Sequence, residues 1–197
     1  NKNMNKNTIF DTIQKKGGFI TTGEIKDRSE YEQLRRATDN GTLMRIRKGV
    51  YVKTSALANN MIDVERIIPN GVLCLYSAFS HYELSTQVPS ATCIAIEAKR
   101  KVRLPEYPPI ELFFWKPENL NFGIIQKQIS GYIVRITDME RTVCDAVKYR
   151  NKIGLDVCGE IIDNYLKKEN RNISLLHDYA KRLRVKNILT KYLETRL

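Results

Sequence analysis

The sequence is poor in the residues from which metal centres and hydrolytic sites are usually built. It has only two histidines, His81 and His177, and they stand far apart. Its four cysteines lie among apolar neighbours, and none forms a CxxC pair (Cys74, Cys93, Cys144 and Cys158). A structural zinc site needs closely spaced Cys or His ligands. We therefore expect reduced core cysteines, no metal, no cofactor and no catalytic residue.

Long apolar runs are also absent. A membrane-spanning helix needs about 20 consecutive apolar residues, and no stretch of the sequence approaches that length. No signal peptide is visible, so a cytoplasmic protein is expected. The glycine loops that hold phosphates, G-x-x-x-x-G-K-[ST] and G-x-G-x-x-G, do not occur. These absences argue against a membrane protein and against a P-loop or dinucleotide-binding enzyme.

Positive charge is what the sequence has in excess. It holds 33 Lys and Arg against 22 Asp and Glu, a formal net charge of +11. Residues 1–60 carry +6, from 12 basic and 6 acidic residues, and residues 61–197 carry +5, from 21 and 16. The charge density is therefore higher in the N-terminal part. Such a balance favours a polyanionic partner.

The N-terminal part follows the order of a winged helix-turn-helix. The expected elements are a helix over 6–16, a short strand over 19–20, a helix over 23–27, a helix over 29–40 and a two-stranded hairpin over 42–52. Thr21 or Thr22 is expected to cap the second helix, with Thr21 and Glu24 spaced as a capping box. Backbone N–H groups at such a helix start favour phosphate. Thr21 and Thr22 are therefore candidate DNA contacts.

The third helix is the candidate recognition helix. Ser29 and Glu32 have the spacing of a capping box, so the helix is expected to begin at Ser29. It should end near Asn40, with Gly41 in the left-handed conformation. Leu34 is expected to be buried, together with Tyr31 and Ala37, which lie about 60° to either side of it on a helical wheel.

The opposite face of this helix carries the candidate base-reading side chains. Ser29, Glu32, Gln33 and Arg36 fall on that face, and Arg35 lies on its flank. A helix fits the major groove, which is about 12 Å wide, and its N-terminal part meets the base edges.

The hairpin that follows is the candidate wing. Its strands are expected over 42–46 and 50–52, joined by a turn over 47–49 in which Gly49 permits a positive φ. Arg45, Arg47 and Lys48 place three positive charges near its tip, suited to phosphates or to a minor groove. The alternative is an ordinary solvated basic hairpin.

The second part of the chain is expected to be an α+β domain. The turn Pro69-Asn70-Gly71 divides the chain into residues 1–68, the winged helix-turn-helix domain, and residues 69–197. Four or five strands are expected there, including 92–98, 110–115 and a hairpin around Ser130-Gly131. A helix that opens at Thr137 and carries Val143, Ala146 and Val147 is expected next, followed by helices over 155–168, 173–183 and 185–195. The fold class is therefore α+β: a winged helix-turn-helix, then a mixed sheet with C-terminal helices.

The stretch around residue 140 has the spacing of a helix cap and of an ion pair along the same helix. Thr137 and Glu140 have capping-box spacing. Arg141 and Asp145 are four residues apart and suited to an ion pair on the helix. The alternative for residues 138–141 is an active-site cluster.

One stretch allows an enzymatic interpretation. Glu97-Ala98-Lys99 ends an apolar strand, as in metal-dependent nucleases of the restriction type. That chemistry needs a second acid to hold Mg²⁺, and the preceding interval offers Glu83 on a predicted helix and no aspartate. The basic run that follows is a second candidate nucleic-acid patch or a solvated loop (Lys99, Arg100, Lys101 and Arg103).

Three stretches together resemble the AbiEi-type antitoxins, transcriptional regulators of bacterial abortive-infection toxin–antitoxin operons. They are GGFITTGEI with LRRATDNGTLMRIRKGVYV, then YSAFSHYEL, then ITDMERTVCDAV. The resemblance implies an N-terminal domain that binds inverted repeats in the operon promoter as a repressor. It also implies a C-terminal domain that neutralises a nucleotidyltransferase-like toxin, and no enzymatic activity. The family's basic residues correspond to Arg35, Arg36, Arg45, Arg47 and Lys48, while Glu30 and Glu32 make this helix more acidic than expected. Glu32 is suited to accept a hydrogen bond from a cytosine amino group.

Three functions are therefore carried forward. The first is a DNA-binding autorepressor and antitoxin. The second is a metal-dependent nuclease that uses Glu97 and Lys99. The third is a winged-helix protein-interaction module without a role on DNA.

Overall fold

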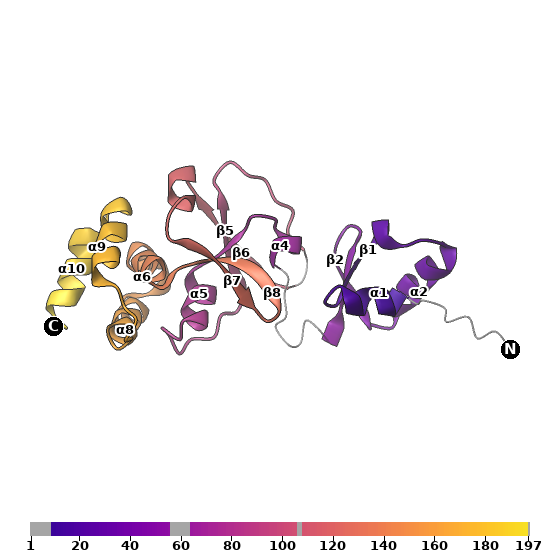
Figure 1. The fold of residues 1–197 in the computed structure, drawn as a ribbon, viewed down its shortest axis with the longest axis horizontal. Coiled ribbons are helices and arrows are strands. Elements are labelled where there is room, and N and C mark those ends of the chain that lie inside the picture. The colour runs from indigo at the N-terminus through magenta and orange to yellow at the C-terminus, as the bar shows by residue number, and fades with distance from the viewer. Residues whose placement is uncertain (1–8, 56–63, 106–107, 197) are drawn as a thin grey trace. The chain divides into compact units, whose positions relative to one another are not determined.

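The computed structural model describes residues 9–55, 64–105 and 108–196. The chain divides into two compact units (Figure 1): one comprises residues 1–63 with 103–108, and the other comprises residues 64–102 with 109–197. Helices and strands occur in both units, which confirms the α+β class. In the part of the chain so described, no helix combines the length and the apolar composition needed to cross a bilayer.

The N-terminal unit is a winged helix-turn-helix. Its elements are α1 (Ile9–Lys15), β1 (Phe19–Thr21), η1 (Thr22–Glu24), α2 (Arg28–Asp39), β2 (Leu43–Arg47) and β3 (Val50–Lys53). The three strands form an antiparallel sheet in the order β1-β3-β2. Apolar side chains from both helices and the sheet make one core (Ile9, Ile13, Ile20, Leu34, Ala37 and Leu43). The helical stretch expected over 6–16 agrees with α1, except that residues 6–8 lie outside the described residues.

The second helix is shorter than predicted. The sequence predicts a helix over 23–27, whereas the structure has the single 3-10 turn η1. Ile25 adopts an extended backbone (φ −80°, ψ 124°), and its side chain packs against the core of the unit. The extended backbone at Ile25 ends the helical turn, so the sequence prediction of an α-helix here is wrong.

The C-terminal unit is a five-stranded mixed sheet with helices. Its strands are β4 (Val72–Leu73), β5 (Thr92–Glu97), β6 (Ile110–Trp115), β7 (Ile124–Ile129) and β8 (Tyr132–Thr137). Its helices are α4 (Val64–Ile67), α5 (Leu75–His81), η2 (Pro117–Leu120), α6 (Met139–Lys148), α7 (Arg150–Ile153), α8 (Leu155–Leu166), α9 (Ile173–Arg182) and α10 (Lys186–Glu194). The strand order is β6-β5-β4-β8-β7, with parallel pairs β4–β8 and β5–β6. The hairpin predicted at Ser130-Gly131 is confirmed, because Ile129 pairs with Tyr132.

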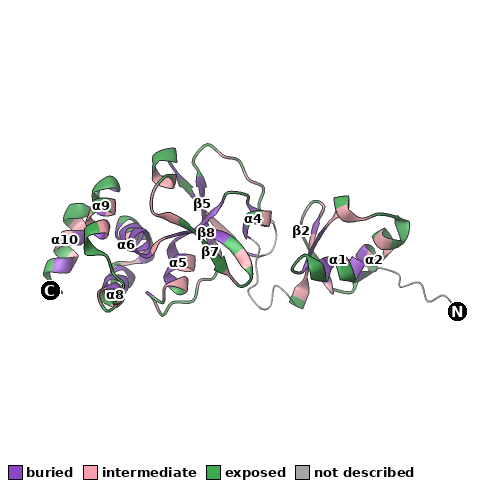
Figure 2. Cartoon of the chain, in the orientation of Figure 1, coloured by how far each residue is buried: buried purple, intermediate pink, exposed green. Residues whose placement is uncertain are grey.

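Helix α6 is the centre of this unit. It packs against α5, α8 and α9, and every residue from Met139 to Val147 is buried (Figure 2). Together with these helices, β4, β5 and β6 contribute side chains to a single large core. Figure 1 shows α8, α9 and α10 gathered on the α6 side of the sheet.

The cap of α6 differs from the predicted one. Asp138, rather than Thr137, is the N-cap, and its Oδ1 accepts from the backbone N–H of Arg141 at 2.8 Å. Strand β8 continues through Thr137, so the helix starts one residue later than a Thr137 cap requires. Glu140 does not complete a capping box. Its Oε1 accepts from the Tyr165 hydroxyl at 3.0 Å and from the Asn172 backbone N–H at 2.8 Å.

The predicted pair of Arg141 and Asp145 is confirmed and lies in the core. Arg141 Nε is 3.0 Å from Asp145 Oδ1, and both side chains are 1% exposed. The guanidinium also donates to the carbonyl oxygens of Asn119 (2.7 Å) and Phe122 (2.9 Å). It lies 4.6 Å from the ring centroid of Trp115. Arg141 thus ties the η2 segment to α6, and the structure supports a structural rather than catalytic role for residues 138–141.

Candidate nucleic-acid interface

Helix α2 begins one residue before the predicted start. Asp27 is its N-cap, and Asp27 Oδ1 accepts from the backbone N–H of Glu30 at 2.9 Å. Glu30 Oε2 in turn accepts from the backbone N–H of Lys26 at 2.8 Å. The predicted capping box of Ser29 and Glu32 is therefore wrong, because Asp27 and Glu30 form the helix start instead. The predicted end of the helix is confirmed, since Asn40 is the C-cap and Gly41 has a φ of +77°.

The buried stripe of α2 is narrower than predicted. Leu34 and Ala37 are buried in the core as expected, but the Tyr31 side chain is 54% exposed. The core lies on the side of Leu34 that Ala37 occupies, which leaves Tyr31 on the outward side. The exposed residues of α2 follow this outward side along its length (Arg28, Ser29, Tyr31, Arg35, Arg36 and Asp39). The sequence reading missed Arg28 and Tyr31 as candidate contacts.

Two polar residues of α2 already have partners within the unit. Gln33 Oε1 accepts from the backbone N–H of Ile9 at 3.3 Å, so this side chain is directed at α1. Glu32 and Arg35 form an ion pair of 3.4 Å. Two acidic residues of the recognition helix are thus engaged, Glu30 at the helix start and Glu32 with Arg35. Arg28 and Arg36 have no ion pair or side-chain hydrogen bond within the described residues.

The wing is a tight hairpin of β2 and β3. Arg47 pairs with Val50, so the turn consists of Lys48 and Gly49 alone, and Arg47 belongs to β2 rather than to the predicted turn. A register shift lies between Arg45 and Arg47. Gly49 has the expected positive φ, at +76°. Lys48 and Arg45 are exposed, so the wing presents cations to solvent.

Thr21 and Thr22 lie against this turn. Thr21 pairs with Val50 in the sheet, and the backbone N–H of Thr22 donates to the Gly49 carbonyl at 2.8 Å. A Cβ atom on Gly49 would lie 2.9 Å from Thr22 Oγ1. The fold therefore brings Thr21 and Thr22, at the start of η1, close to the turn of the wing that contains Lys48.

Glu24, the last residue of η1, completes the capping box and pairs with a lysine. Glu24 Oε2 accepts from the backbone N–H of Thr21 at 2.8 Å, as the predicted capping box requires. Glu24 also forms an ion pair with Lys16 of the segment after α1. Burial acts to raise the pKa of Glu24, but the hydrogen bonds from Lys16 and Thr21 outweigh it and hold the pKa below its ordinary value. Glu24 therefore stays ionised at neutral pH and fixes the start of η1.

Three residues of the second candidate patch, Lys99, Arg100 and Lys101, belong to the C-terminal unit, whereas Arg103 belongs to the N-terminal one. Lys99, Lys101 and Arg103 are exposed, whereas Arg100 is half-buried and donates to the Pro69 carbonyl. Part of this basic run is therefore used to fasten the loop to the segment before β4.

The carboxylate of the nuclease hypothesis stands on an exposed strand end. Glu97 is the last residue of β5 and pairs in register with Trp115. Among the residues of known placement, no group of three or more His, Cys, Asp or Glu side chains is positioned to hold a metal ion. Within the described part of the chain, Glu97 therefore belongs to no cluster of three such metal ligands.

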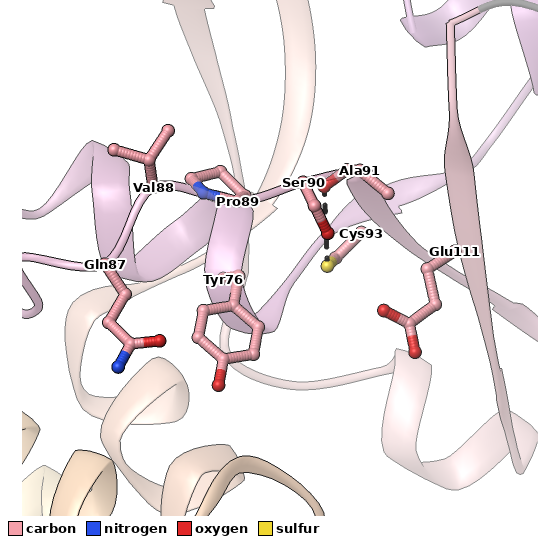
Figure 3. A pocket seen from close by; sticks show the side chains of 8 residues that line it. All are labelled: Tyr76, Gln87, Val88, Pro89, Ser90, Ala91, Cys93 and Glu111. Atoms are coloured by element: carbon pink, nitrogen blue, oxygen red, sulfur yellow. Dashed lines mark hydrogen bonds between the residues drawn. The ribbon is translucent and has the colours of Figure 1, made fainter.

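A cavity of about 240 Å³ opens on the C-terminal unit (Figure 3). Its lining comprises Tyr76, Cys93 and Glu111 together with the loop segment 87–91. Glu111 Oε1 lies 2.5 Å from Lys152 Nζ, and the Tyr76 hydroxyl donates to the Ile153 carbonyl at 3.3 Å. Burial raises the pKa of the Cys93 thiol, which keeps the thiol protonated at neutral pH. The side chains of Glu111 and Tyr76 are thus already engaged within the protein.

The N-terminal unit is of the winged helix-turn-helix class, with its helix α2 and its wing exposed. Residues 7–52 match the model of a family described as "Transcriptional regulator, AbiEi antitoxin". The matched segment covers the unit from α1 into β3, which confirms the resemblance to AbiEi-type antitoxins for this part of the chain. The family description names transcriptional regulation and an antitoxin, and it names no catalytic activity. No curated protein matches the chain.

Proposed function

We propose that this protein is a sequence-specific DNA-binding repressor of its own operon and the antitoxin of a toxin–antitoxin pair. Residues 1–68 would serve as the DNA-binding domain and residues 69–197 as the antitoxin domain. The observation that carries the proposal is the outward side of α2, where the exposed arginines Arg28, Arg35 and Arg36 stand on one helix. The family match over residues 7–52 supports the same conclusion.

In the proposed complex, α2 enters the major groove with its N-terminal half toward the base pairs. Arg36 has no acidic partner among the described residues, so its guanidinium is available for the two acceptors of a guanine. Glu32, oriented by Arg35, would accept from a cytosine amino group. Ser29 on the first turn would add a hydroxyl contact.

The wing and the start of η1 would bind the backbone of the same duplex. Lys48 in the turn and Arg45 on β2 are exposed cations, and Thr21 and Thr22 lie beside the turn. Such contacts position a protein on DNA without reading sequence. We also propose Arg47 as a backbone contact, because the sequence places it next to Lys48.

The operator would be an inverted repeat, bound by two copies of the protein. The C-terminal unit would then contact a nucleotidyltransferase-like toxin from the same operon. The inverted repeat is what the resemblance to AbiEi-type antitoxins implies. The toxin partner is supported by the word antitoxin in the family description and by the sequence resemblance of the segments near residues 76–84 and 136–147.

The experiment is a fluorescence-anisotropy titration of the full chain with two duplexes. One carries the DNA upstream of its gene, and the other is a shuffled duplex of equal length and composition. We expect tighter binding to the upstream duplex and an affinity for both that falls steeply with salt, because Lys and Arg displace counterions. Equal affinity for the two duplexes would refute a sequence-specific repressor.

The two alternatives have separate tests. A nuclease acting through Glu97 would cleave plasmid DNA in the presence of Mg²⁺ or Mn²⁺, and Glu97→Ala would abolish the cleavage. A winged-helix module for protein binding alone would leave repression in cells intact after charge reversal of Arg47 and Lys48. The proposed repressor predicts no cleavage in the first test and loss of repression in the second.

A further inference from the structure

An aromatic side chain stands on the outward side of the recognition helix. Tyr31 is 54% exposed, although its position near Leu34 on a helical wheel suggests a place in the core. It is the fourth residue of α2 and therefore lies in the N-terminal half of the helix. In helix-turn-helix proteins this half is the part that meets the base edges.

The neighbours of Tyr31 along the helix are cationic. Arg28 precedes it by three residues and Arg35 follows it by four, so both lie on the same side of α2 as the ring. An exposed ring between two arginines combines an apolar surface with groups that bind phosphate or guanine. Ser29, Glu32 and Arg36 on the other flank are polar and suited to hydrogen bonding.

The major groove offers one apolar group on its base edges, the C5-methyl of thymine. Hydrogen-bonding side chains gain little from a methyl group, whereas an aromatic ring buries it. Tyr31 is the large apolar side chain that α2 exposes, as Leu34 and Ala37 are covered by the core. Phe10 on α1, Met44 on β2 and Leu104 are the other large apolar side chains that this unit exposes within the described residues.

We propose that Tyr31 is a specificity-determining residue that reads thymine, with its ring packed on the C5-methyl group of a T·A pair. Arg28 and Arg35 hold the DNA on either side of that pair. The proposal rests on the proposed DNA-binding function and adds the base class that α2 recognises.

The test uses the upstream duplex, once its bound region is known. Each thymine in that region is replaced in turn by deoxyuridine, which removes the methyl and leaves the hydrogen-bonding pattern of the base pair unchanged. With the natural protein we expect one or two positions per half-site where the change weakens binding about three- to tenfold, as removal of a buried methyl implies.

Three variants assign that effect to the ring. Tyr31→Ala should bind the thymine duplex more weakly and should not distinguish it from the deoxyuridine duplex. Tyr31→Phe keeps the ring and should retain the discrimination. Phe10→Ala removes an exposed ring outside α2 and should also retain it. Because Tyr31 is largely exposed, thermal unfolding of Tyr31→Ala should stay close to that of the natural protein.

The outcomes separate the inference from the function on which it rests. Equal binding to upstream and shuffled duplexes refutes the proposed function itself. Preference for the upstream duplex without any deoxyuridine effect refutes only the reading of thymine. A deoxyuridine effect that survives Tyr31→Ala, or is lost in Tyr31→Phe, assigns the recognition to another group and overturns the proposal for the ring.

Discussion

The backbone N–H of Thr22 donates to the carbonyl oxygen of Gly49 at 2.8 Å. This hydrogen bond joins the start of η1 to the turn of the wing, and the pairing of Thr21 with Val50 continues the connection through the sheet. The wing is therefore part of the three-stranded sheet rather than an isolated hairpin. In the proposed complex, the orientation of Lys48 is set by the same contacts that place Thr21 and Thr22.

Gly49→Ala tests how tightly the wing turn is fixed. Both Gly49 (φ +76°) and Gly41 (φ +77°) have left-handed backbones, so alanine at either position should lower the free energy of unfolding by about 1–2 kcal/mol. At Gly49 the new Cβ also meets Thr22 Oγ1, whereas nothing lies within 4 Å at Gly41. We expect Gly49→Ala to be the more destabilising in urea denaturation. Adding Thr22→Ala should recover the difference, and equal losses at both glycines would contradict this account of the turn.

Asp27→Ala tests where the recognition helix begins. Asp27 accepts from the backbone N–H of Glu30, and its removal leaves that donor without its partner at the helix start. We expect a loss of about 1 kcal/mol in the free energy of unfolding. Ser29→Ala is the matched control and should change stability by less than about 0.5 kcal/mol. A larger loss for Ser29→Ala than for Asp27→Ala would restore the helix start predicted from the sequence.

Arg36→Ala and Lys48→Ala should weaken DNA binding in different ways. Loss of Arg36 should reduce the preference for the upstream duplex by about 1–3 kcal/mol, since a base contact is removed. Loss of Lys48 should weaken binding to all duplexes alike and lower the salt slope by about one. Lys167→Ala removes an exposed charge from α8's C-terminal end and serves as the control for net charge. Identical effects of Lys48→Ala and Lys167→Ala would show that the wing makes no specific phosphate contact.

Asp145 predicts a pH dependence of stability. Burial raises its pKa to about 6 despite the nearby Arg141, and Asp145 Oδ2 has no hydrogen-bond partner within the described residues. The folded protein therefore keeps a proton between about pH 4 and pH 6 that the unfolded chain releases. The stabilisation from this group is full below about pH 4 and is lost as the pH rises through about 6, with a slope of at most about 1.4 kcal/mol per pH unit.

Asp145→Asn removes this titration and keeps an oxygen that can accept from Arg141 Nε. Urea denaturation of both proteins from pH 4 to pH 7 measures the difference in their unfolding free energies. We expect the natural protein to lose stability relative to the variant as the pH rises through this range. A constant difference would mean that Asp145 is ionised throughout and that its ion pair outweighs burial.

Local signals predicted much of the N-terminal unit. The glycines at positions 41 and 49 mark backbones with positive φ, and the alternation of apolar residues identifies β2 and β3. The predicted start of α2 is wrong because two capping motifs overlap in the sequence. Asp27 with Glu30 and Ser29 with Glu32 have the same spacing, and the choice between them depends on where the preceding segment packs. For the same reason the predicted helix over 29–40 leaves out Arg28, which is the first residue of α2.

Burial was predictable only where it did not depend on packing between distant segments. Tyr31 lies at the edge of the apolar stripe, and its exposure follows from the side on which the core covers α2. The pair of Arg141 and Asp145 followed from helical spacing. The burial of the pair could not be predicted in this way. It depends on the carbonyl oxygens of Asn119 and Phe122, which accept from Arg141 and lie about 20 residues away in sequence.

The most direct test of the central proposal is a nuclear magnetic resonance titration of the ¹⁵N-labelled full chain with the upstream duplex. The proposal predicts that backbone amide signals of residues 28–36 and of the Lys48-Gly49 turn shift together, at the same protein-to-DNA ratio. It would be contradicted if these signals stayed unchanged while the duplex bound, or if the shifts were confined to the C-terminal unit.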